Sequence, residues 1–259
     1  MDIKELERMS EMHELGELFA AIWGRPGEPP IDSSTLQALS HSGNYVVGAY
    51  SGKRMVGGLI GWLGGQPPDD LHLHSHILGV VPDTETRGVG FELKQHQRMW
   101  CLDRGVPSIE WTFDPLVRRN AYFNLAKLGA DAVEYLVDFY GPMDDGINTG
   151  DESDRLLVRW TLDSPTVVHK ARGRVELAWP VRADEALGVT PSGEPHVVRV
   201  AGPFVVVRVP EDIVAIRQTN AALARRWRFA VRYVLGEAMT SGYRVAGATR
   251  DGRYLLTRR

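Results

Sequence analysis

Two glycines, Gly88 and Gly90, stand at the predicted start of a helix, directly after a strand and a short polar turn. The unpaired N–H groups of a helix start carry the positive end of the helix dipole, so they attract anions. Glycine has no side chain, which lets a phosphate group approach these amides. Residues 80–94 therefore predict a turn that binds a phosphate-bearing ligand. A tight turn without a ligand is the alternative.

Two familiar phosphate loops are excluded by spacing. The sequence contains neither Gly-x-x-x-x-Gly-Lys-Ser/Thr, the loop of nucleotide triphosphatases, nor the complete Gly-x-Gly-x-x-Gly of dinucleotide-binding proteins. The phosphate is therefore expected to belong to another kind of ligand.

Three histidines, His72, His74 and His76, alternate along the strand before this turn. Alternate residues of a strand share one face if no bulge intervenes. Histidine titrates near neutrality, and His76 is nearest to the turn. We therefore predict that His76 is a general base that accepts a proton from an amine, directly or through water, and that His74 contacts the substrate. Solvent-facing or hydrogen-bonded structural histidines are the alternative.

No metal site is predicted from these histidines. Successive members lie about 6.7 Å apart along a strand, too far to converge on one ion without other elements. The single cysteine, Cys101, lies in an amphipathic helix and is expected to be a buried packing thiol. One cysteine can form no internal disulfide, which favours a reducing compartment and a cytoplasmic location.

Acidic and polar residues after the next strand offer further candidates. Asp114 is a second candidate base or ammonium anchor, ranked above Glu110, although Asp114 before Pro115 could instead cap a turn. In the polar loop that follows, Asn148 is a predicted hydrogen-bonding group for the acceptor and Arg155 a predicted partner for its carboxylate. An ordinary acidic hairpin loop is the alternative.

Three arginines near the C-terminus, Arg225, Arg228 and Arg232, recur at helical spacing. Such a stripe is usually the solvated face of a helix, which is the reading we favour. If it faced the cleft, it could neutralise a phosphate or a dicarboxylate.

Strands and helices must position these residues, and the hydrophobic periodicity predicts their order. Turn residues separate the elements, and glycines end several of the helices. The mixed order indicates an α/β layered structure. The expected strands are 3–9, 45–50, 55–62, 71–81, 108–113, 132–139, 156–162, 175–179, 197–209, 243–249 and 254–257, and the expected helices are 11–23, 36–39, 88–104, 120–127 and 210–239.

Length and charge restrict the classes of protein that remain. The 259 residues suffice for one or two domains, and 43% of them are hydrophobic, as in soluble globular proteins. Thirty basic and thirty-three acidic residues leave a net charge of −3, which favours neither nucleic acid nor an anionic membrane as a partner. No apolar run reaches the roughly 20 residues of a membrane span, and the charged start does not resemble a signal peptide.

The sequence around Gly88 resembles the GNAT superfamily of N-acyltransferases. In that superfamily a Gln/Arg-x-x-Gly-x-Gly/Ala segment after a Val-x-Pro strand end holds the pyrophosphate of acyl-CoA. The matching residues are Glu85-Thr86-Arg87-Gly88-Val89-Gly90 after Val80-Val81-Pro82, with Glu85 in place of Gln or Arg. The segment 120–130 resembles the Asn/Ala-rich helix of the superfamily, which ends in Lys-Leu-Gly. The segments 75–80, 111–116 and 153–156 resemble those of a bacterial branch of predicted acetyltransferases.

This resemblance, which covers residues 1–162, implies a co-substrate and a mechanism. Acetyl-CoA or succinyl-CoA is the expected co-substrate, because relatives of that branch succinylate amino-acid amines. Direct attack by the amine is implied, without a covalent enzyme intermediate. The implied cofactor-binding residues are Val80, Val81, Arg87, Gly88, Val89, Gly90 and Asn120.

The general acid is left open by the resemblance. The superfamily commonly uses a tyrosine four residues before the helix-ending glycine, a position that Leu125 occupies here. Tyr122 is our predicted replacement, and Tyr140 or solvent are the alternatives.

Together these observations predict an α/β (α+β) protein with a GNAT-like mixed central sheet flanked by helices. Residues 1–163 form the acyl-CoA-binding core, and residues 164–259 form an α+β module that shapes the acceptor site or a homodimer. The expected activity is transfer of an acetyl or succinyl group to the amine of a small molecule, with amino acids as one candidate class. The alternative is a non-catalytic module that binds acyl-CoA or another ligand.

Overall fold

The computed structural model of the chain describes residues 1–66, 69–82, 87–143, 146, 150–173, 180 and 182–258. These residues form two compact units. The described part of the first is 1–111 with residue 146, and that of the second is 112–143 with 150–258. The boundary predicted at 163/164 was based on the extent of the sequence resemblance, not on which residues pack into one compact unit. It therefore stays a prediction.

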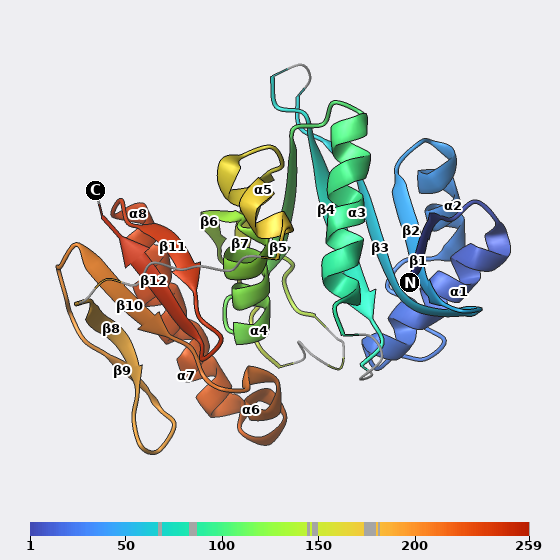
Figure 1. The fold of residues 1–259 in the computed structure, drawn as a ribbon. Helices are drawn as coiled ribbons and strands as arrows, with labels where there is room; N and C mark the ends of the chain where they lie inside the picture. The colour runs from blue at the N-terminus through green and yellow to red at the C-terminus, as the bar shows by residue number, and fades with distance from the viewer. Residues whose placement is uncertain are drawn as a thin grey trace. The chain divides into compact units, whose positions relative to one another are not determined.

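The first unit is a sheet with helices on both faces (Figure 1). Its strands follow the order β1-β2-β3-β4-β5, in which only β4 and β5 are parallel. The last two residues of β5, 112 and 113, already belong to the second unit. The elements are β1 (Asp2–Glu5), α1 (Met9–Ile22), α2 (Ser33–His41), β2 (Tyr45–Ser51), β3 (Arg54–Gly64), β4 (His72–Val80), α3 (Val89–Asp103) and β5 (Ser108–Phe113).

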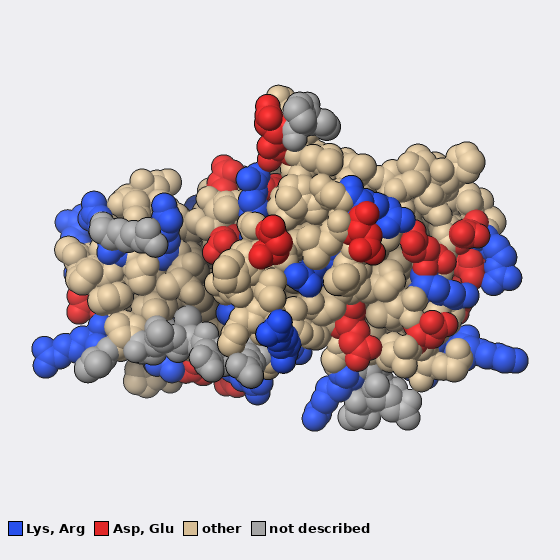
Figure 2. Space-filling view, turned by 45° about the horizontal axis from the view of Figure 1, so that its top comes forward, with Lys and Arg blue, Asp and Glu red and all other residues tan. Residues whose placement is uncertain are grey.

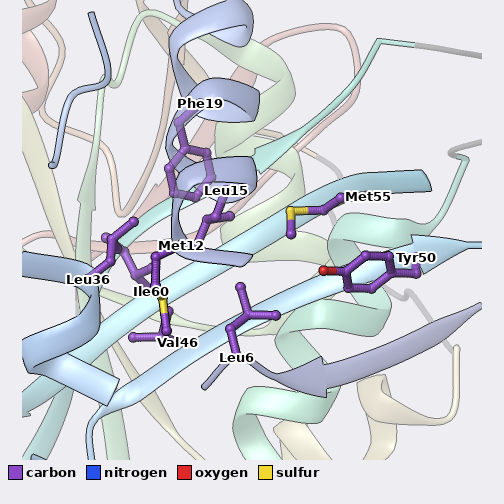
Figure 3. Close-up of a cluster of buried hydrophobic side chains, with 9 residues drawn as sticks. All are labelled: Leu6, Met12, Leu15, Phe19, Leu36, Val46, Tyr50, Met55 and Ile60. Atoms are coloured by element: carbon purple, nitrogen blue, oxygen red, sulfur yellow. The ribbon is translucent and has the colours of Figure 1, made fainter. Parts of the chain in front are cut away.

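Alternation along β2 shows how the two helical layers attach to this sheet. Val46 packs into a buried cluster with residues of α1 and α2, whereas its neighbour Tyr45 contacts His96 and Trp100 of α3. Successive side chains of a strand point to opposite faces, so α1 and α2 cover one face and α3 covers the other. Figure 3 shows the first cluster, whose members are Leu6, Met12, Leu15, Phe19, Leu36, Val46, Tyr50, Met55 and Ile60.

The second unit contains two groups of strands. Strands β7 and β6 continue from β5 in the order β5-β7-β6, and a separate sheet has the order β11-β12-β10-β8-β9, mixed because β8 and β10 are parallel. Its elements are α4 (Arg118–Ala121), the π-helix η2 (Tyr122–Leu128), β6 (Asp131–Leu136), β7 (Arg155–Thr161), α5 (Pro165–Ala171), β8 (Asp184–Val189), β9 (Pro195–Val197), β10 (Phe204–Arg208), α6 (Ile213–Thr219), α7 (Ala221–Val231), the π-helix η3 (Arg232–Gly236), α8 (Glu237–Thr240), β11 (Arg244–Ala248) and β12 (Arg253–Thr257).

The sequence predicted the first unit better than the C-terminal half. The expected helix 210–239 was wrong as one element, because Asn220 leaves the helical conformation (φ −152°, ψ 79°). Its side-chain oxygen accepts the N–H of Leu223 at 3.0 Å, which ends α6 and caps α7, the role for which asparagine is suited. Helix α5 and strand β8 were not predicted, and the expected strand 175–179 lies outside the described residues.

The surface carries charges of both signs. Figure 2 shows basic and acidic side chains interspersed on the face in view. Among the described residues, no helix is both long enough and apolar enough to cross a membrane.

Candidate active site

Strand β4 contains a bulge at His76. Gly61 of β3 pairs with Ser75 and Ile60 pairs with Ile77, so His76 has no partner opposite it. The predicted alternation of the three histidines therefore ends at a bulge. His76 is exposed on the surface beside this irregularity, an arrangement that bulges often provide next to functional sites.

His74 and His76 nevertheless remain neighbours on one face of β4. Their ring centroids lie 5.6 Å apart, and both rings contact Trp62, at 5.0 Å for His74 and 4.6 Å for His76. Burial and the nearby histidine charges lower the pKa of His74 to about 4. Although the His76 side chain is exposed, the surrounding protein lowers its pKa too. His76 is therefore neutral at pH 7 and able to accept a proton.

Strands β4 and β5 pair over a short length only. The pairs are Leu73 with Ile109 and His74 with Glu110, although β4 continues to Val80. Within the described residues the ladder stops where the bulge begins. We call the region beyond His74, between β4 and β5 of the first unit, the β4–β5 split.

The turn before α3 has the conformation expected of a phosphate cradle. Gly88 has φ 94°, which favours glycine, and a Cβ placed there would meet nothing within 4 Å. Gly90 packs against β4, with its ideal Cβ 3.7 Å from a methyl of Leu78 and 3.8 Å from one of Val80. Arg87 is exposed beside Gly88, and Val89 is buried. Glu85 lies outside the described residues.

Some amides near the turn bind carbonyls of the chain itself. The N–H of Phe91 donates to the carbonyl of Gly88 at 2.9 Å, so the hydrogen bonds of α3 already begin at Phe91. The N–H of Val81, one of the residues predicted to bind the cofactor, likewise donates to Val56 O at 2.9 Å. Because the first amides of a helix have no carbonyl one turn earlier to bind, Gly88, Val89 and Gly90 remain the candidates for an anion.

Asp114, the second candidate base, is held by two arginines, and its role as a base stays a prediction. It is buried in the second unit, where Arg228 donates to both carboxylate oxygens at 3.0 Å and Arg217 also donates to it. Burial alone would raise its pKa, but the two guanidinium groups outweigh burial and hold the pKa well below its usual value. Its Oδ1 also accepts the N–H of Leu116 at 2.9 Å, so the alternative of a turn cap is confirmed.

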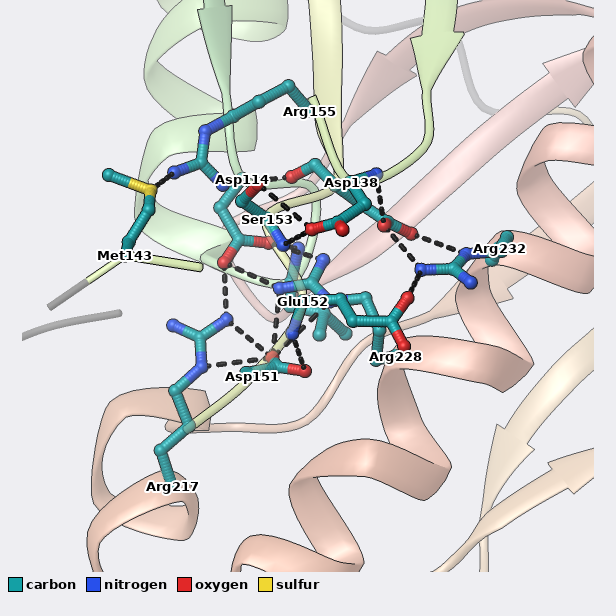
Figure 4. Close-up of polar contacts among 12 residues, drawn as sticks. Asp114, Asp138, Met143, Asp151, Glu152, Ser153, Arg155, Arg217, Arg228 and Arg232 are labelled. Carbon is teal, nitrogen blue, oxygen red and sulfur yellow. Dashed lines mark hydrogen bonds and ion pairs between the residues drawn. The ribbon is translucent and has the colours of Figure 1, made fainter. Parts of the chain in front are cut away.

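The C-terminal arginines are not a solvated stripe. Arg228 and Arg217 also bind Asp151, with shortest distances of 3.0 and 2.9 Å, and these four residues form what we call the Asp114 cluster. Arg232 binds Asp154 and Glu152, while Arg225 is exposed. Figure 4 shows how α6, α7 and η3 supply Arg217, Arg228 and Arg232 to the segment before β7.

Arg155, the predicted carboxylate partner, is buried in the second unit. It donates to Asp154 O at 3.0 Å and to the sulfur of Met143, and its guanidinium lies 5.3 Å from the ring of Tyr140. Burial lowers its pKa. Its assignment to the acceptor stays a prediction, as does that of Asn148, which lies outside the described residues.

The residues of the helix after β5 are placed as follows. Asn120 is half-buried in α4, and Leu125, at the position of the superfamily tyrosine, is buried in η2. The ring of Tyr122 lies 5.0 Å from the guanidinium of Arg250, and the hydroxyl of Tyr140 contacts that of Thr112 at 3.2 Å. The roles predicted for Asn120 and Tyr122 are not tested by this placement.

The charges of the Asp114 cluster predict how stability depends on pH. The folded-state pKa of Asp114 lies below its unfolded value of about 3.9, so its stabilisation is complete above that value and is lost as the pH falls towards the folded pKa. We expect the urea midpoint to decrease as the pH is lowered from 5 to 3. The decrease should be smaller in Asp114→Asn, and an equal decrease in both proteins would contradict the assignment.

The cluster contains residues that the sequence reading did not find. Arg217 and Asp151 received no role, because no local pattern of the sequence relates an arginine of α6 to an aspartate 66 positions earlier. Among the described residues, no group of three or more histidine, cysteine, aspartate or glutamate side chains is arranged to hold a metal ion.

Solved structures show the same fold. Aminoglycoside 6'-acetyltransferase type Ii is similar with a TM-score of 0.50 at 18% identity, covering 63% of this chain and 99% of its own. Naa20 of Chaetomium thermophilum, in complex with a bisubstrate analogue, is similar with a TM-score of 0.50 at 13% identity, covering 67% of this chain and 90% of its own. No protein-family model and no curated protein sequence matches the chain. The chain therefore has the fold of GNAT acetyltransferases, as the sequence resemblance predicted.

Proposed function

We propose that this protein is an acyl-CoA-dependent N-acyltransferase that transfers an acetyl or succinyl group to the amine of a small molecule. The observation that carries the proposal is a GNAT fold in which a left-handed Gly88 opens α3 beside a strand that parts from its neighbour. The amides at the N-terminus of a helix suit a diphosphate. Where two strands part, their backbone N–H and C=O groups are left for an extended ligand to bind.

The donor is held, in this proposal, by the first unit. The amides of Gly88, Val89 and Gly90 receive the diphosphate, and exposed Arg87 adds a positive charge. Val80 and Val81 at the end of β4 follow the same edge. Asn120 of the second unit is carried over from the superfamily motif only.

Transfer requires a neutral amine and a polarised carbonyl. In direct attack, the amine nitrogen bonds to the thioester carbon and loses a proton, and His76 is the group that we assign to accept it. A histidine with a lowered pKa stays neutral at pH 7, so it is available as a base. Cys101 is not needed as a nucleophile, because it is buried and burial raises its pKa to about 12.

The proposal leaves the acyl donor and the amine acceptor to be identified by experiment. Calorimetric titration with acetyl-CoA and succinyl-CoA tests donor binding, and failure of both to bind at millimolar concentration would overturn it. A thiol-release assay across amino acids, aminoglycosides and short peptides then tests transfer. Sustained release of CoA that depends on an amine supports the enzyme, whereas binding without release supports the non-catalytic alternative.

Gly88→Ala tests the cradle. We expect acetyl-CoA to bind at least tenfold more weakly, because the added methyl group stands where the diphosphate must approach and a positive φ disfavours alanine. Gly105→Ala is the matched control. Gly105 follows the other end of α3, also has a positive φ (70°), and would place its methyl group in open space. Both variants should lose similar stability, and equal affinity for acetyl-CoA in the two would contradict the cradle.

A further inference from the structure

The first unit contains a buried lysine, Lys94 of α3, with only 3% of its surface exposed. Its ammonium donates to Ser75 Oγ of β4 at 2.9 Å and to Gln97 Oε1 of α3 at 3.1 Å. It also lies 3.7 Å from the ring centroid of Trp111 on β5. Three elements of the sheet and helix layer therefore converge on one cation.

This cation has no acidic partner within the described part of the chain. The contacts from β4 and β5 are a hydroxyl and an aromatic ring, and Gln97 of α3 packs against Gly61 of β3. The titratable neighbours of Lys94 are the thiol of Cys101 on α3 and the imidazole of His74 on β4, whose pKa the lysine charge helps to lower. Burial lowers the pKa of Lys94 to about 7. Burying an ammonium without a counter-charge is costly, so such a group is a candidate for function.

Lys94 lies where the paired part of β4 and β5 ends and the β4–β5 split begins. The last pair of the ladder is His74 with Glu110, and Lys94 contacts the next residue of each strand, Ser75 and Trp111. Ser75 lies about 17 Å along β4 from Val80, at the cradle end of that strand. The extended pantetheine arm of coenzyme A can cover such a length. His76, on the other face of β4, lies one residue away.

We propose that Lys94 is the general acid of the acyl transfer and protonates the departing thiolate of coenzyme A. This inference rests on the proposed function. As the C–S bond breaks, its electron pair goes to sulfur, and an N–H proton of the Lys94 ammonium goes to the same sulfur to give the CoA thiol. The neutral amine of Lys94 then recovers a proton from solvent, and the acceptor's proton leaves through His76, so the charges balance.

The position where the superfamily keeps its tyrosine supports this assignment. Leu125 cannot donate a proton, so the acid is another group, and we assign this role to Lys94 in place of Tyr122. An ammonium with a pKa near 7 is substantially protonated at neutral pH and is a stronger acid than a thiol, whose pKa is about 8.5. A lysine on α3 can therefore supply the proton that the missing hydroxyl would have supplied.

Titration of bound coenzyme A tests this without an acceptor. The ultraviolet absorbance of the thiolate is followed against pH for CoA free in solution, bound to the wild type, and bound to Lys94→Met. A nearby ammonium favours the thiolate, so we expect about tenfold more thiolate at pH 7 for CoA on the wild type than for free CoA. CoA on Lys94→Met should titrate like free CoA. Lys53→Met, in the exposed turn between β2 and β3, should behave as the wild type.

The outcomes separate the two proposals. Absence of CoA binding to the wild type would overturn the proposed function and this inference with it. Binding with an unshifted thiol, or with the same shift in Lys94→Met, would overturn the role of Lys94 alone. If Lys94→Met does not fold, nitrogen NMR of the Lys94 ammonium in the wild type replaces it. The pKa of Lys94 should then rise when CoA is added, and an unchanged pKa would overturn the inference.

Discussion

Arg228→Met is expected to lower the free energy of unfolding by about 3–5 kcal/mol, the usual cost of removing one partner from a buried ion pair. Arg228 is 1% exposed and holds both Asp114 and Asp151. The substitution keeps an apolar stem of similar length but leaves two buried carboxylates to share the guanidinium of Arg217. The cost therefore comes from uncompensated charge rather than from an empty space. Equilibrium unfolding in urea measures it.

Arg226→Met is the matched control on the same helix. Its ion pair with Glu194 is shorter, at 2.7 Å against 3.0 Å for Arg228, but the two side chains are 49% and 38% exposed. Water already solvates such a pair, so we expect a much smaller loss of stability than in Arg228→Met. Adding Asp114→Asn to Arg228→Met should restore part of the lost stability, because one unpaired charge is removed. Equal losses in the two single variants would show that the Asp114 cluster is not a buried ionic centre.

The first unit could be predicted because its signals are local. The capping side chain of Asp32 accepts the N–H of Thr35 at 3.0 Å, and the turn at Gly52 joins two strands, as their residue types indicated. The continuous helix expected before β11 was wrong because two local signals conflict there. Apolar periodicity runs through Asn220, whereas the side chain of Asn220 competes for a backbone N–H and interrupts the helix.

The part of the candidate site that lies on β4 and the turn after it could be predicted from the sequence. His76 and the Gly88 turn are separated by a few residues, so sequence spacing sufficed to relate them. The Asp114 cluster joins residues more than one hundred positions apart, such as Asp114 and Arg228. Such a pairing depends on how distant segments fold together. From residue type alone, Asp114 was predicted to be a base and the arginines a solvated stripe. Lys94 was missed because a lysine in a helix usually faces solvent.

The fates of Asp114 and His76 show how environment separates two candidate bases. Both residues could accept a proton by type. Two arginines stabilise the charged form of Asp114, which makes its carboxylate a poor proton acceptor near neutrality. No such partner restrains His76, which is exposed at the bulge and neutral at pH 7. Of these two candidates, His76 is the one whose environment leaves it neutral, and its role as the base stays our proposal.

His76→Ala is expected to reduce kcat by about 10²–10⁴-fold with the amine found by the thiol-release assay, because that is the usual contribution of a positioned base. The affinity for acetyl-CoA should stay within a factor of two, since the cradle lies at the other end of β4. The acidic limb of the wild-type pH profile should fall at a pH below the ordinary histidine pKa of about 6.5, because the pKa of His76 is lowered. His76→Ala should lack that limb.

His13→Ala, an exposed histidine on α1, is the control and should keep the wild-type rate and profile. The pH profile is the decisive readout, because a merely structural histidine at the bulge would lower the rate without removing an ionisation from it. A variant with an unchanged profile and a reduced rate would show that His76 only shapes the strand. Equal rate and equal profile would exclude it from proton transfer, and the amine would then have to lose its proton to another group.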